Sequence, residues 1–395
     1  MSDDKAPLHP ATQVGRKGRD PAKYLGAVNT PVFRASTIVF PTVADLEASA
    51  QGRSDNLGYG LHGLPTVRDL QQAVADIEGG HAALAVPSGL SATTLPLQAL
   101  LEAGDHILVT DSVYGPTRRF CDNHLTRWGV DVSYYDPLCG EAIEEHFRPE
   151  TRVVFTESPG SLTFEVQDIP AIARVAHARD ALVVMDNTWA TPLFFPSFAH
   201  GVDVSVHAAT KYIGGHSDVL LGLIVANARA YPRLQRFWTD TGVTASTDDC
   251  FLGLRGLRTL AVRLAQHQAS ALEIAAWLAR RPEVKEVIYP ALPGARGHDL
   301  WRRDFTGASG LFGVVLQPVA KERIAAMLDG MRLFSMGWSW GGFESLMIPT
   351  WPERARTVTR WNAGGPCLRL QIGLEDPRDL IADLAAGLLR LGGAA

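Results

Sequence analysis

The sequence predicts an α/β protein, with a mostly parallel sheet in a large domain and a smaller α+β domain at the C-terminal end. Two observations carry this prediction. Between Leu84 and Asn227, short apolar runs typical of strands alternate with segments of helical spacing, the pattern of a parallel sheet with crossover helices. From about Val284 onward, strand-like runs mix with helical segments instead. The expected division is an N-terminal arm at 1–57, a large domain at 58–255, and a linking helix with the α+β domain at 256–395.

Composition and charge indicate an ordinary globular chain. The 395 residues are 46% apolar and 20% charged, which is enough apolar material for two cores. A formal net charge of −5 gives no basic field, so we expect neither nucleic acid nor a membrane as a partner. No apolar signal core and no run of about 18 apolar residues occur, which favours a cytoplasmic protein. Four scattered cysteines without metal-ligand spacing predict no disulfide framework and no metal site.

The chain opens with a segment that cannot form a core alone. Residues 1–57 are rich in Pro, Gly, Ser and charge, and they carry one apolar patch at Thr37–Val43. We expect this arm to wrap over the main domain or over a neighbouring subunit. After the arm, apolar residues recur at helical spacing between Pro65 and Gly79, which predicts a helix there.

The next unit, HAALAVPSGLSATTLPLQALLEAGD, has the pattern of a strand, a Pro-Ser-Gly turn and a helix. Backbone amides at a helix N-terminus bind phosphate, and a glycine lets a ligand approach closely. Ser88, Gly89 and Leu90 therefore form the predicted phosphate site, acting through their amides more than through their side chains. Such a unit is common in proteins, so the prediction gains weight only from the motifs that follow it.

Two later strands end in an acid and an amine. The apolar run ALVVM closes on Asp186, and the strand that begins at Val202 leads through Thr210 to Lys211. Ligands collect beyond the carboxyl ends of such strands, so both side chains can face one small molecule. Pyridoxal 5′-phosphate (PLP) needs both, an amine for its aldehyde and an acid for its ring nitrogen. The alternative is a surface lysine and a helix-capping aspartate, but the turn TKYIGGHSD is too elaborate for an ordinary loop.

The C-terminal part predicts a second sheet and an arginine that binds an anion. Strands are expected at VKEVIYP, GLFGVVLQP, RLFSMG, ESLMIP and CLRLQIGL, with helices at Lys321–Leu328 and Pro377–Leu391. Arg369 lies on an otherwise buried strand and needs an anionic partner. The α-carboxylate of an amino acid substrate fits a guanidinium, and an internal salt bridge is the alternative. Solvation or ion pairing is expected for the arginines of the linking helix, Arg255, Arg258 and Arg263.

Together these motifs resemble a known family. ATKYIGGHSD, with DNTWATP upstream, is similar to the lysine loop and aspartate strand of the Cys/Met-metabolism family of PLP-dependent enzymes. The similarity runs from about Tyr59 to the C-terminus. ALPGARGHDLWRRDFTGASGLF and FSMGWSWGGFESL resemble the β-lyase branch rather than the γ-synthases and γ-lyases. The resemblance implies PLP as cofactor, the type I fold of PLP-dependent transferases with a seven-stranded sheet, and a homotetramer whose active sites are shared across dimers.

The resemblance also implies roles for residues of the cofactor site. Lys211 would carry the cofactor and transfer protons, and Asp186 would keep the pyridine nitrogen protonated. Tyr114 would lie flat against the ring and take part in proton transfer. Thr210 would contact the cofactor beside Lys211, and the corner that begins at Glu157 would line its pocket.

Other implied roles concern the substrate and the neighbouring subunit. Arg369, Ser339 and Trp340 would bind the substrate, with Trp338 and Trp189 as further aromatic walls. In the family, a Tyr-x-Arg motif of one subunit grips the cofactor phosphate in the next. Tyr59 occupies the tyrosine position and is expected to contact cofactor and substrate, but the arginine position is Leu61, followed by His62. Either His62 or another cation supplies the charge, or the cofactor is held more weakly.

The resemblance implies cleavage of the carbon–sulfur bond of L-cystathionine by β-elimination, a step of methionine biosynthesis, extending to other cysteine S-conjugates. The products are homocysteine, pyruvate and ammonia. Two alternatives share the fold: a γ-lyase or γ-synthase, and a general cysteine S-conjugate β-lyase. A non-catalytic PLP-binding regulator is disfavoured because Lys211, Asp186, Tyr114 and Arg369 occur together. A dinucleotide dehydrogenase is disfavoured because no GxGxxG follows the first strand.

Overall fold

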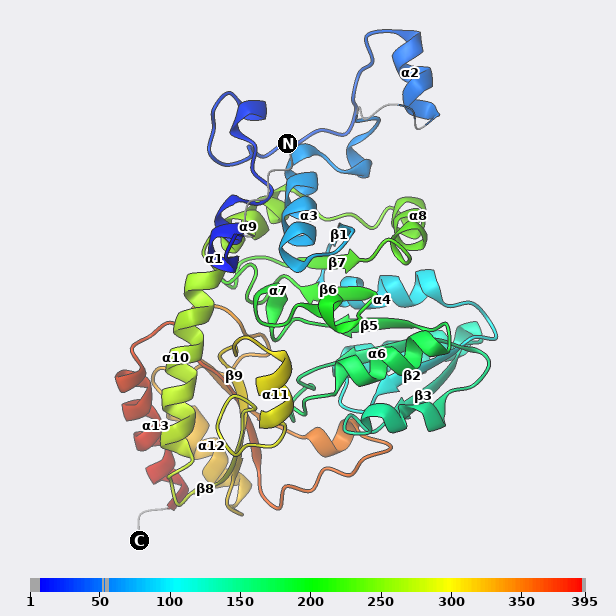
Figure 1. Cartoon of the computed structure of the whole chain (residues 1–395). Helices are drawn as coiled ribbons and strands as arrows, with labels where there is room; N and C mark the ends of the chain where they lie inside the picture. The colour runs from blue at the N-terminus through cyan, green and yellow to red at the C-terminus, as the bar shows by residue number, and fades with distance from the viewer. Residues whose placement is uncertain (1–7, 52, 54–56, 393–395) are drawn as a thin grey trace.

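A seven-stranded sheet forms the centre of the larger part of the molecule (Figure 1). The computed structural model describes residues 8–51, 53 and 57–392. The strand order is β1-β7-β6-β5-β4-β2-β3; β2 to β6 run parallel, and β7 is antiparallel to both neighbours. The predicted α/β class with a mostly parallel sheet is therefore confirmed. The strands are β1 (Ala82–Val86), β2 (His106–Thr110), β3 (Asp131–Tyr135), β4 (Thr151–Glu157), β5 (Leu182–Asp186), β6 (Val204–Ala208) and β7 (Gly222–Ala226).

Helices cover both faces of this sheet, because its strands are apolar on both sides. In β7, Leu223 and Val225 pack toward α3 and α9, whereas Ile224 and Ala226 pack toward α4 and α8. This two-sided burial explains why the strands appear as continuous apolar runs rather than as alternating ones. The helices of this part are α3 (Pro65–Glu78), α4 (Gly89–Leu100), α5 (Gly115–Phe120), α6 (Ile169–Ala178), α7 (Thr191–Phe194), α8 (Tyr231–Thr241), α9 (Thr247–Arg258) and α10 (Leu260–Leu278).

A second sheet, four-stranded and antiparallel in the order β10-β11-β9-β8, forms the C-terminal part. Its elements are β8 (Val284–Ile288), β9 (Leu311–Leu316), β10 (Leu346–Thr350), β11 (Cys367–Gln371), α11 (His298–Asp304), α12 (Lys321–Asp329) and α13 (Pro377–Gly392). One apolar cluster continues from the α6 side of the large sheet into this part. The predicted boundary between 255 and 256 falls within α9, and the domain division itself stays a prediction.

One expected strand is absent. RLFSMG, residues 332–337, forms only an isolated bridge between Ser335 and Leu346. The reason lies in Asp383 of α13, whose carboxylate accepts backbone N–H bonds from residues 332, 333 and 334, from Leu333 at 2.7 Å. A side chain distant in sequence therefore satisfies the amides that a strand would have used, and the segment is free to form a loop beside the larger sheet.

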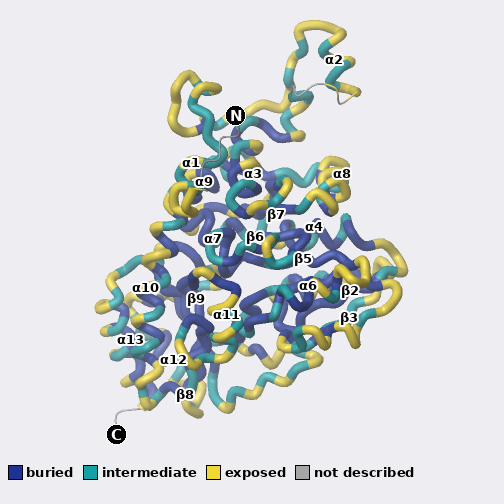
Figure 2. Tube along the Cα trace, viewed as in Figure 1, coloured by how far each residue is buried: buried dark blue, intermediate teal, exposed yellow. Residues whose placement is uncertain are grey.

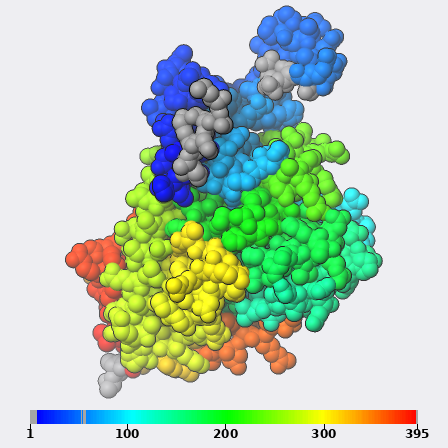
Figure 3. All heavy atoms as spheres, viewed as in Figure 1, coloured from blue at the N-terminus to red at the C-terminus, as the bar shows by residue number. Residues whose placement is uncertain are grey.

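The arm crosses the top of the molecule and extends beyond it. Its helix α1 (Pro10–Arg16) packs against α9 and α10 through buried Val14, whereas α2 (Val43–Ala50) projects away from the body (Figures 1 and 3). Figure 2 shows that much of the arm is exposed. Val39 of the arm has 85% of its surface accessible. Of the helices described, none is long and apolar enough to cross a membrane.

One buried carboxylate connects the part of the chain built on the large sheet to the part built on the small sheet. Asp111, which follows β2, forms an ion pair with Arg118 at 2.6 Å. It also accepts backbone N–H bonds from residues 357, 358 and 359 of the loop between β10 and β11, from Thr359 at 2.7 Å. Burial alone would raise the pKa of Asp111, but the bonds from this loop outweigh burial and lower the pKa to about 2.

Candidate active site

The candidate site lies at the carboxyl ends of β4, β5 and β6. Glu157 is the last residue of β4 and pairs in register with Asp186, the last residue of β5. Lys211 follows three residues after β6 ends at Ala208. Parallel strands end at one edge of a sheet, so the fold brings these side chains to a common place, as the sequence predicted.

The Lys211 amine faces the C-terminal domain. Its Nζ donates a hydrogen bond of 2.7 Å to the Ser339 hydroxyl and lies 5.3 Å from the centre of the Trp340 ring. Burial and the nearby Arg369 guanidinium lower the pKa of Lys211 to about 8, although Asp186 acts in the opposite direction. At pH 7 about a tenth of this amine is therefore uncharged, far more than for an ordinary lysine, and the uncharged form is the one that acts as a nucleophile or base.

The two carboxyl groups behave differently. Asp186 accepts a 3.0 Å bond from the Thr188 amide; burial raises its pKa, and the bonds from Thr188 oppose the rise. Burial and the charge of Asp186 raise the pKa of Glu157 well above its ordinary value. Glu157 also accepts a 2.7 Å bond from the Tyr114 amide. We therefore take Asp186 as the charged member of the pair and Glu157 as a neutral acid that fixes the Tyr114 backbone.

Tyr114 stands at the entrance of the site. It is the residue before α5, and 46% of its surface is accessible. Burial and the Glu157 carboxyl raise the pKa of its phenol, so the phenol stays protonated at neutral pH. An accessible aromatic face beside Asp186 fits the ring-stacking role that the sequence predicted.

The predicted phosphate site lies at the start of α4. Ser88 caps this helix, its Oγ accepting from the Ser91 amide at 3.1 Å. The amides of Gly89 and Leu90 have no acceptor in the part of the chain that the structure describes. A Cβ on Gly89 would collide with Ala208, so only glycine allows the helix to start this close to the lysine loop. Thr210 is not free, because its hydroxyl accepts from the Leu221 amide at 3.0 Å.

Arg369 comes from β11, in the middle of the C-terminal sheet. Its Nη2 donates to the backbone carbonyls of residues 337, 338 and 339, to Ser339 at 3.0 Å. Burial lowers the pKa of this guanidinium to about 10. Among the described residues no carboxylate lies within ion-pair distance, so the alternative of an internal salt bridge is not seen there. Nε and Nη1 make no hydrogen bond to the described chain and can receive a carboxylate.

The structure does not bring Tyr59 together with Lys211. Tyr59 lies at the end of the arm, bridges Thr37, and is 47% exposed. Leu61 lies near Gly242, and His62 lines a separate cavity beside α3 and α8. Within one chain, therefore, none of these three contacts the lysine, and how the missing arginine is replaced stays open.

Two sequence expectations about large side chains were wrong. Arg263 is neither solvated nor ion-paired among the described residues; it is buried and donates to the Tyr212 carbonyl at 2.7 Å and the Gly256 carbonyl at 2.8 Å, fixing the lysine loop. Trp189 presents no free face to the site, because it is buried and donates at 2.9 Å to the Leu311 carbonyl of β9 in the C-terminal sheet. Trp338 is 81% exposed, whereas Trp340 packs against Tyr212.

Several positioning residues were missed because their partners are distant in sequence. Thr188 links Asp186 to β6, since its hydroxyl accepts from the Ala208 amide at 2.9 Å. Glu78 accepts a 2.8 Å bond from His207 in the core beneath the site. The only signal in the sequence was a carboxylate at the buried end of an amphipathic helix, which is unusual enough to have indicated a partner.

The residues present fit PLP. The amine with a lowered pKa suits the aldehyde of PLP, and the opposing carboxylate suits its ring nitrogen. The accessible aromatic face suits the ring, and the free amides at the helix start suit the phosphate. Because Gly89 lets α4 start close against Ala208, the free amides at the start of this helix lie near the end of β6 and the lysine loop. Lys211, Asp186, Tyr114, Ser88, Gly89 and Leu90 are the residues that would hold it.

Comparison with known proteins gives the same answer. A model of the family "Cys/Met metabolism PLP-dependent enzyme" matches residues 11–389. A putative cystathionine beta-lyase of Rhizobium johnstonii is 49% identical, over 95% of each chain. The cystathionine beta-lyase MetC of Escherichia coli is 44% identical, over 96% of this chain and 98% of its own. The crystal structure of MetB from Corynebacterium glutamicum superimposes with a TM-score of 0.90 at 31% identity, covering 97% and 98% of the two chains.

The chain therefore belongs to the Cys/Met metabolism family of PLP-dependent enzymes. Its cofactor is pyridoxal 5′-phosphate, and its fold is the type I fold of that class. The predictions of family, fold, enzyme class and cofactor are confirmed; the roles of individual site residues stay predictions.

Proposed function

We propose that the protein cleaves the Cβ–S bond of L-cystathionine by β-elimination, with water as second reactant, to give homocysteine, pyruvate and ammonia. The main support is that Lys211 and Arg369, which lie on different sheets, meet at one loop. The Lys211 amine donates a hydrogen bond to the Ser339 hydroxyl, and the Arg369 guanidinium donates to the Ser339 carbonyl. Relatives 44% and 49% identical bear the name cystathionine beta-lyase, which supports the substrate assignment over γ-chemistry.

The chain's own residues supply binding and proton transfer. Bound PLP provides an acceptor for the electron pair left at Cα. Arg369 holds the α-carboxylate through the nitrogens that are free of protein bonds, and this fixes Cα near Lys211. The uncharged Lys211 amine removes the Cα proton, and the resulting ammonium donates a proton to the departing sulfur. Tyr114 shields the ring from water, and Asp186 keeps its nitrogen charged.

Ser339 and Trp340 form the substrate side of the site in this proposal. Ser339 accepts from Lys211 and so orients the amine before substrate arrives. Trp340, partly buried on Tyr212, provides an apolar wall for the thioether. The accessible ring of Trp338 lies on the same loop and limits the distal arm of the substrate.

The working form in this proposal is a homotetramer in which each site is completed by a neighbour. The arm supports this, because it presents apolar side chains that the described part of its own chain leaves exposed: Leu25, Val28, Val39, Val43 and Leu46. Tyr59 at its base would reach the neighbour's cofactor and substrate. With Leu61 beside it, the phosphate is held mainly by the α4 amides. Free thiols at all four cysteines fit the cytoplasm as the site of action.

The test is product analysis of the purified, PLP-loaded protein with L-cystathionine. Equal amounts of pyruvate and free thiol are expected. Accumulation of 2-oxobutyrate instead would transfer the function to γ-elimination, and PLP binding without any turnover would favour a regulator. Lys211→Ala is expected to lose turnover, whereas the matched control Lys285→Ala, an exposed lysine of β8, retains it.

A further inference from the structure

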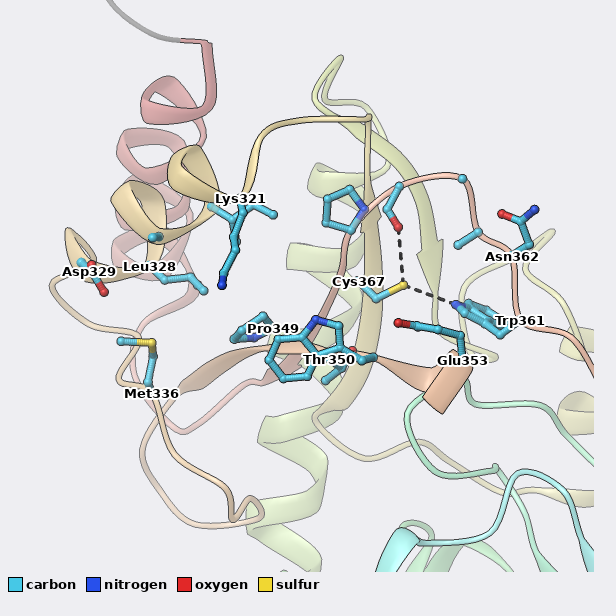
Figure 4. A pocket seen from close by; sticks show the side chains of 17 residues that line it. Lys321, Leu328, Asp329, Met336, Pro349, Thr350, Glu353, Trp361, Asn362 and Cys367 are labelled. Atoms are coloured by element: carbon cyan, nitrogen blue, oxygen red, sulfur yellow. Dashed lines mark hydrogen bonds between the residues drawn. The ribbon is translucent and has the colours of Figure 1, made fainter. Parts of the chain in front are cut away.

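A cavity of about 470 Å³ lies in the C-terminal domain, apart from the residues of the active site (Figure 4). It is bounded by α12, the end of β10, the start of β11 and the loop between these strands. Its volume is in the range of small-molecule sites, ~300–1,000 Å³. The walls are mainly apolar and aromatic, formed by Ile324, Leu328, Met336, Pro349, Trp351 and Trp361.

Three charged side chains line this apolar space: Lys321 and Asp329 of α12, and Glu353 of the loop. Figure 4 shows Lys321 of α12 and Glu353 of the loop pointing into the cavity from opposite walls. Neither side chain has an ion-pair or hydrogen-bond partner within the described ranges, although many other charged residues of the protein are paired. A cation on one wall of an apolar pocket and an anion on the opposite wall complement a zwitterion with an apolar group.

Hydrogen bonds hold the back wall of the cavity in place. Cys367 at the start of β11 accepts a 3.4 Å bond from the Trp361 indole, and its own Sγ donates to the Gly365 carbonyl at 3.9 Å (Figure 4). These bonds hold the Trp361 ring at the edge of the cavity. The loop is also anchored from below, since Arg356 forms an ion pair with Glu165 at 2.8 Å.

The cavity touches the same elements as the active site. Cys367 lies two residues before Arg369 on β11, and Met336 directly precedes the loop whose carbonyls Arg369 binds. A ligand against Met336 would therefore restrain the segment that carries Ser339.

We propose that this cavity binds a free α-amino acid with an apolar side chain. The ligand's carboxylate would pair with Lys321, its ammonium with Glu353, and its side chain would lie against Trp351 and Trp361. This site is separate from the one that holds the substrate, and the proposal does not depend on which carbon–sulfur reaction the enzyme performs.

The experiment is calorimetric titration with L-norleucine, made on the PLP-loaded Arg369→Met variant so that binding through the active-site arginine is removed. One binding event per chain is expected. Lys321→Met and Glu353→Gln, each added to that background, should weaken it at least about ten-fold, the effect of losing a charged hydrogen-bond partner. The matched controls are Arg323→Met and Glu322→Gln, which alter the same charges on α12 outside the cavity. Hexanoate and pentylamine, each lacking one charge of the ligand, should bind correspondingly more weakly.

Hydrogen–deuterium exchange locates the ligand independently of affinity. Saturating L-norleucine should slow exchange in the peptides that contain 321–329 and 334–339. The proposal is overturned if L-norleucine does not bind the Arg369→Met protein, if the four variants bind it equally, or if protection appears elsewhere.

Discussion

The reactivity of Lys211 in the cofactor-free protein offers the sharpest test of the site. Burial and the Arg369 guanidinium lower the pKa of this amine from 10.5 to about 8. At pH 8 an amine of ordinary pKa is only about 0.3% uncharged, whereas one with a pKa near 8 is about half uncharged. Lys211 should therefore react with an electrophile at pH 8 on the order of a hundred times more readily than its ordinary pKa would allow.

The assay is competitive labelling with a trace of acetic anhydride over a pH series, followed by peptide mass spectrometry. Because the uncharged amine reacts, labelling of Lys211 rises with pH and reaches half of its plateau near pH 8. Exposed Lys285 serves as the internal reference in the same digest.

Two substitutions separate the causes of the shift. Arg369→Met removes a positive neighbour and should move the midpoint to higher pH, whereas Asp186→Asn removes a negative neighbour and should move it to lower pH. Arg378→Met, on the exposed start of α13, is the matched control and should leave the midpoint unchanged. A labelling midpoint near pH 10.5 in the wild type, or a midpoint that Arg369→Met does not change, would refute the account of a buried amine beside a guanidinium.

Three further outcomes follow from packing and protonation. Gly89→Ala should lower PLP affinity, seen as cofactor lost on dialysis, because the added Cβ collides with Ala208; full retention would contradict the tight start of α4. Glu157→Gln should keep activity close to wild type, since a neutral amide still accepts from the Tyr114 amide, whereas Glu157→Ala should lower kcat; equal losses in both would show that Glu157 acts as a charge. Asp111→Ala should lower the free energy of unfolding in urea by about 3–5 kcal/mol, because it leaves a buried guanidinium unpaired, and a loss below about 1 kcal/mol would argue against this ion pair.

The sequence predicted what depends on local pattern. The apolar runs predicted that one strand ends at Asp186 and another shortly before Lys211. Because β5 and β6 are parallel neighbours, both side chains lie at the same edge of the large sheet. Arg369 was found for a similar reason, since a charge on a buried strand is conspicuous. The loop at 332–337 could not be predicted, because the carboxylate that takes its amides lies about fifty residues later in α13. Arg263 was misjudged because arginine among leucines looks like a solvated face until the carbonyls of the lysine loop are seen beside it.

The contacts of Asp111 between the two parts of the chain bear on which substrates the proposed mechanism can accept. In the proposed mechanism, the amine that transfers protons belongs to the large sheet and the guanidinium that binds the carboxylate to the small one. The distance between them then depends on how the two sheets are held together. Asp111 provides one such connection, and its pKa of about 2 keeps it charged at neutral pH. In that mechanism, a fixed distance between the amine and the guanidinium would select substrates in which one carbon carries both the carboxylate and the reacting C–H bond. An α-amino acid meets this requirement, whereas a β-amino acid, longer by one bond, would present the wrong carbon to Lys211.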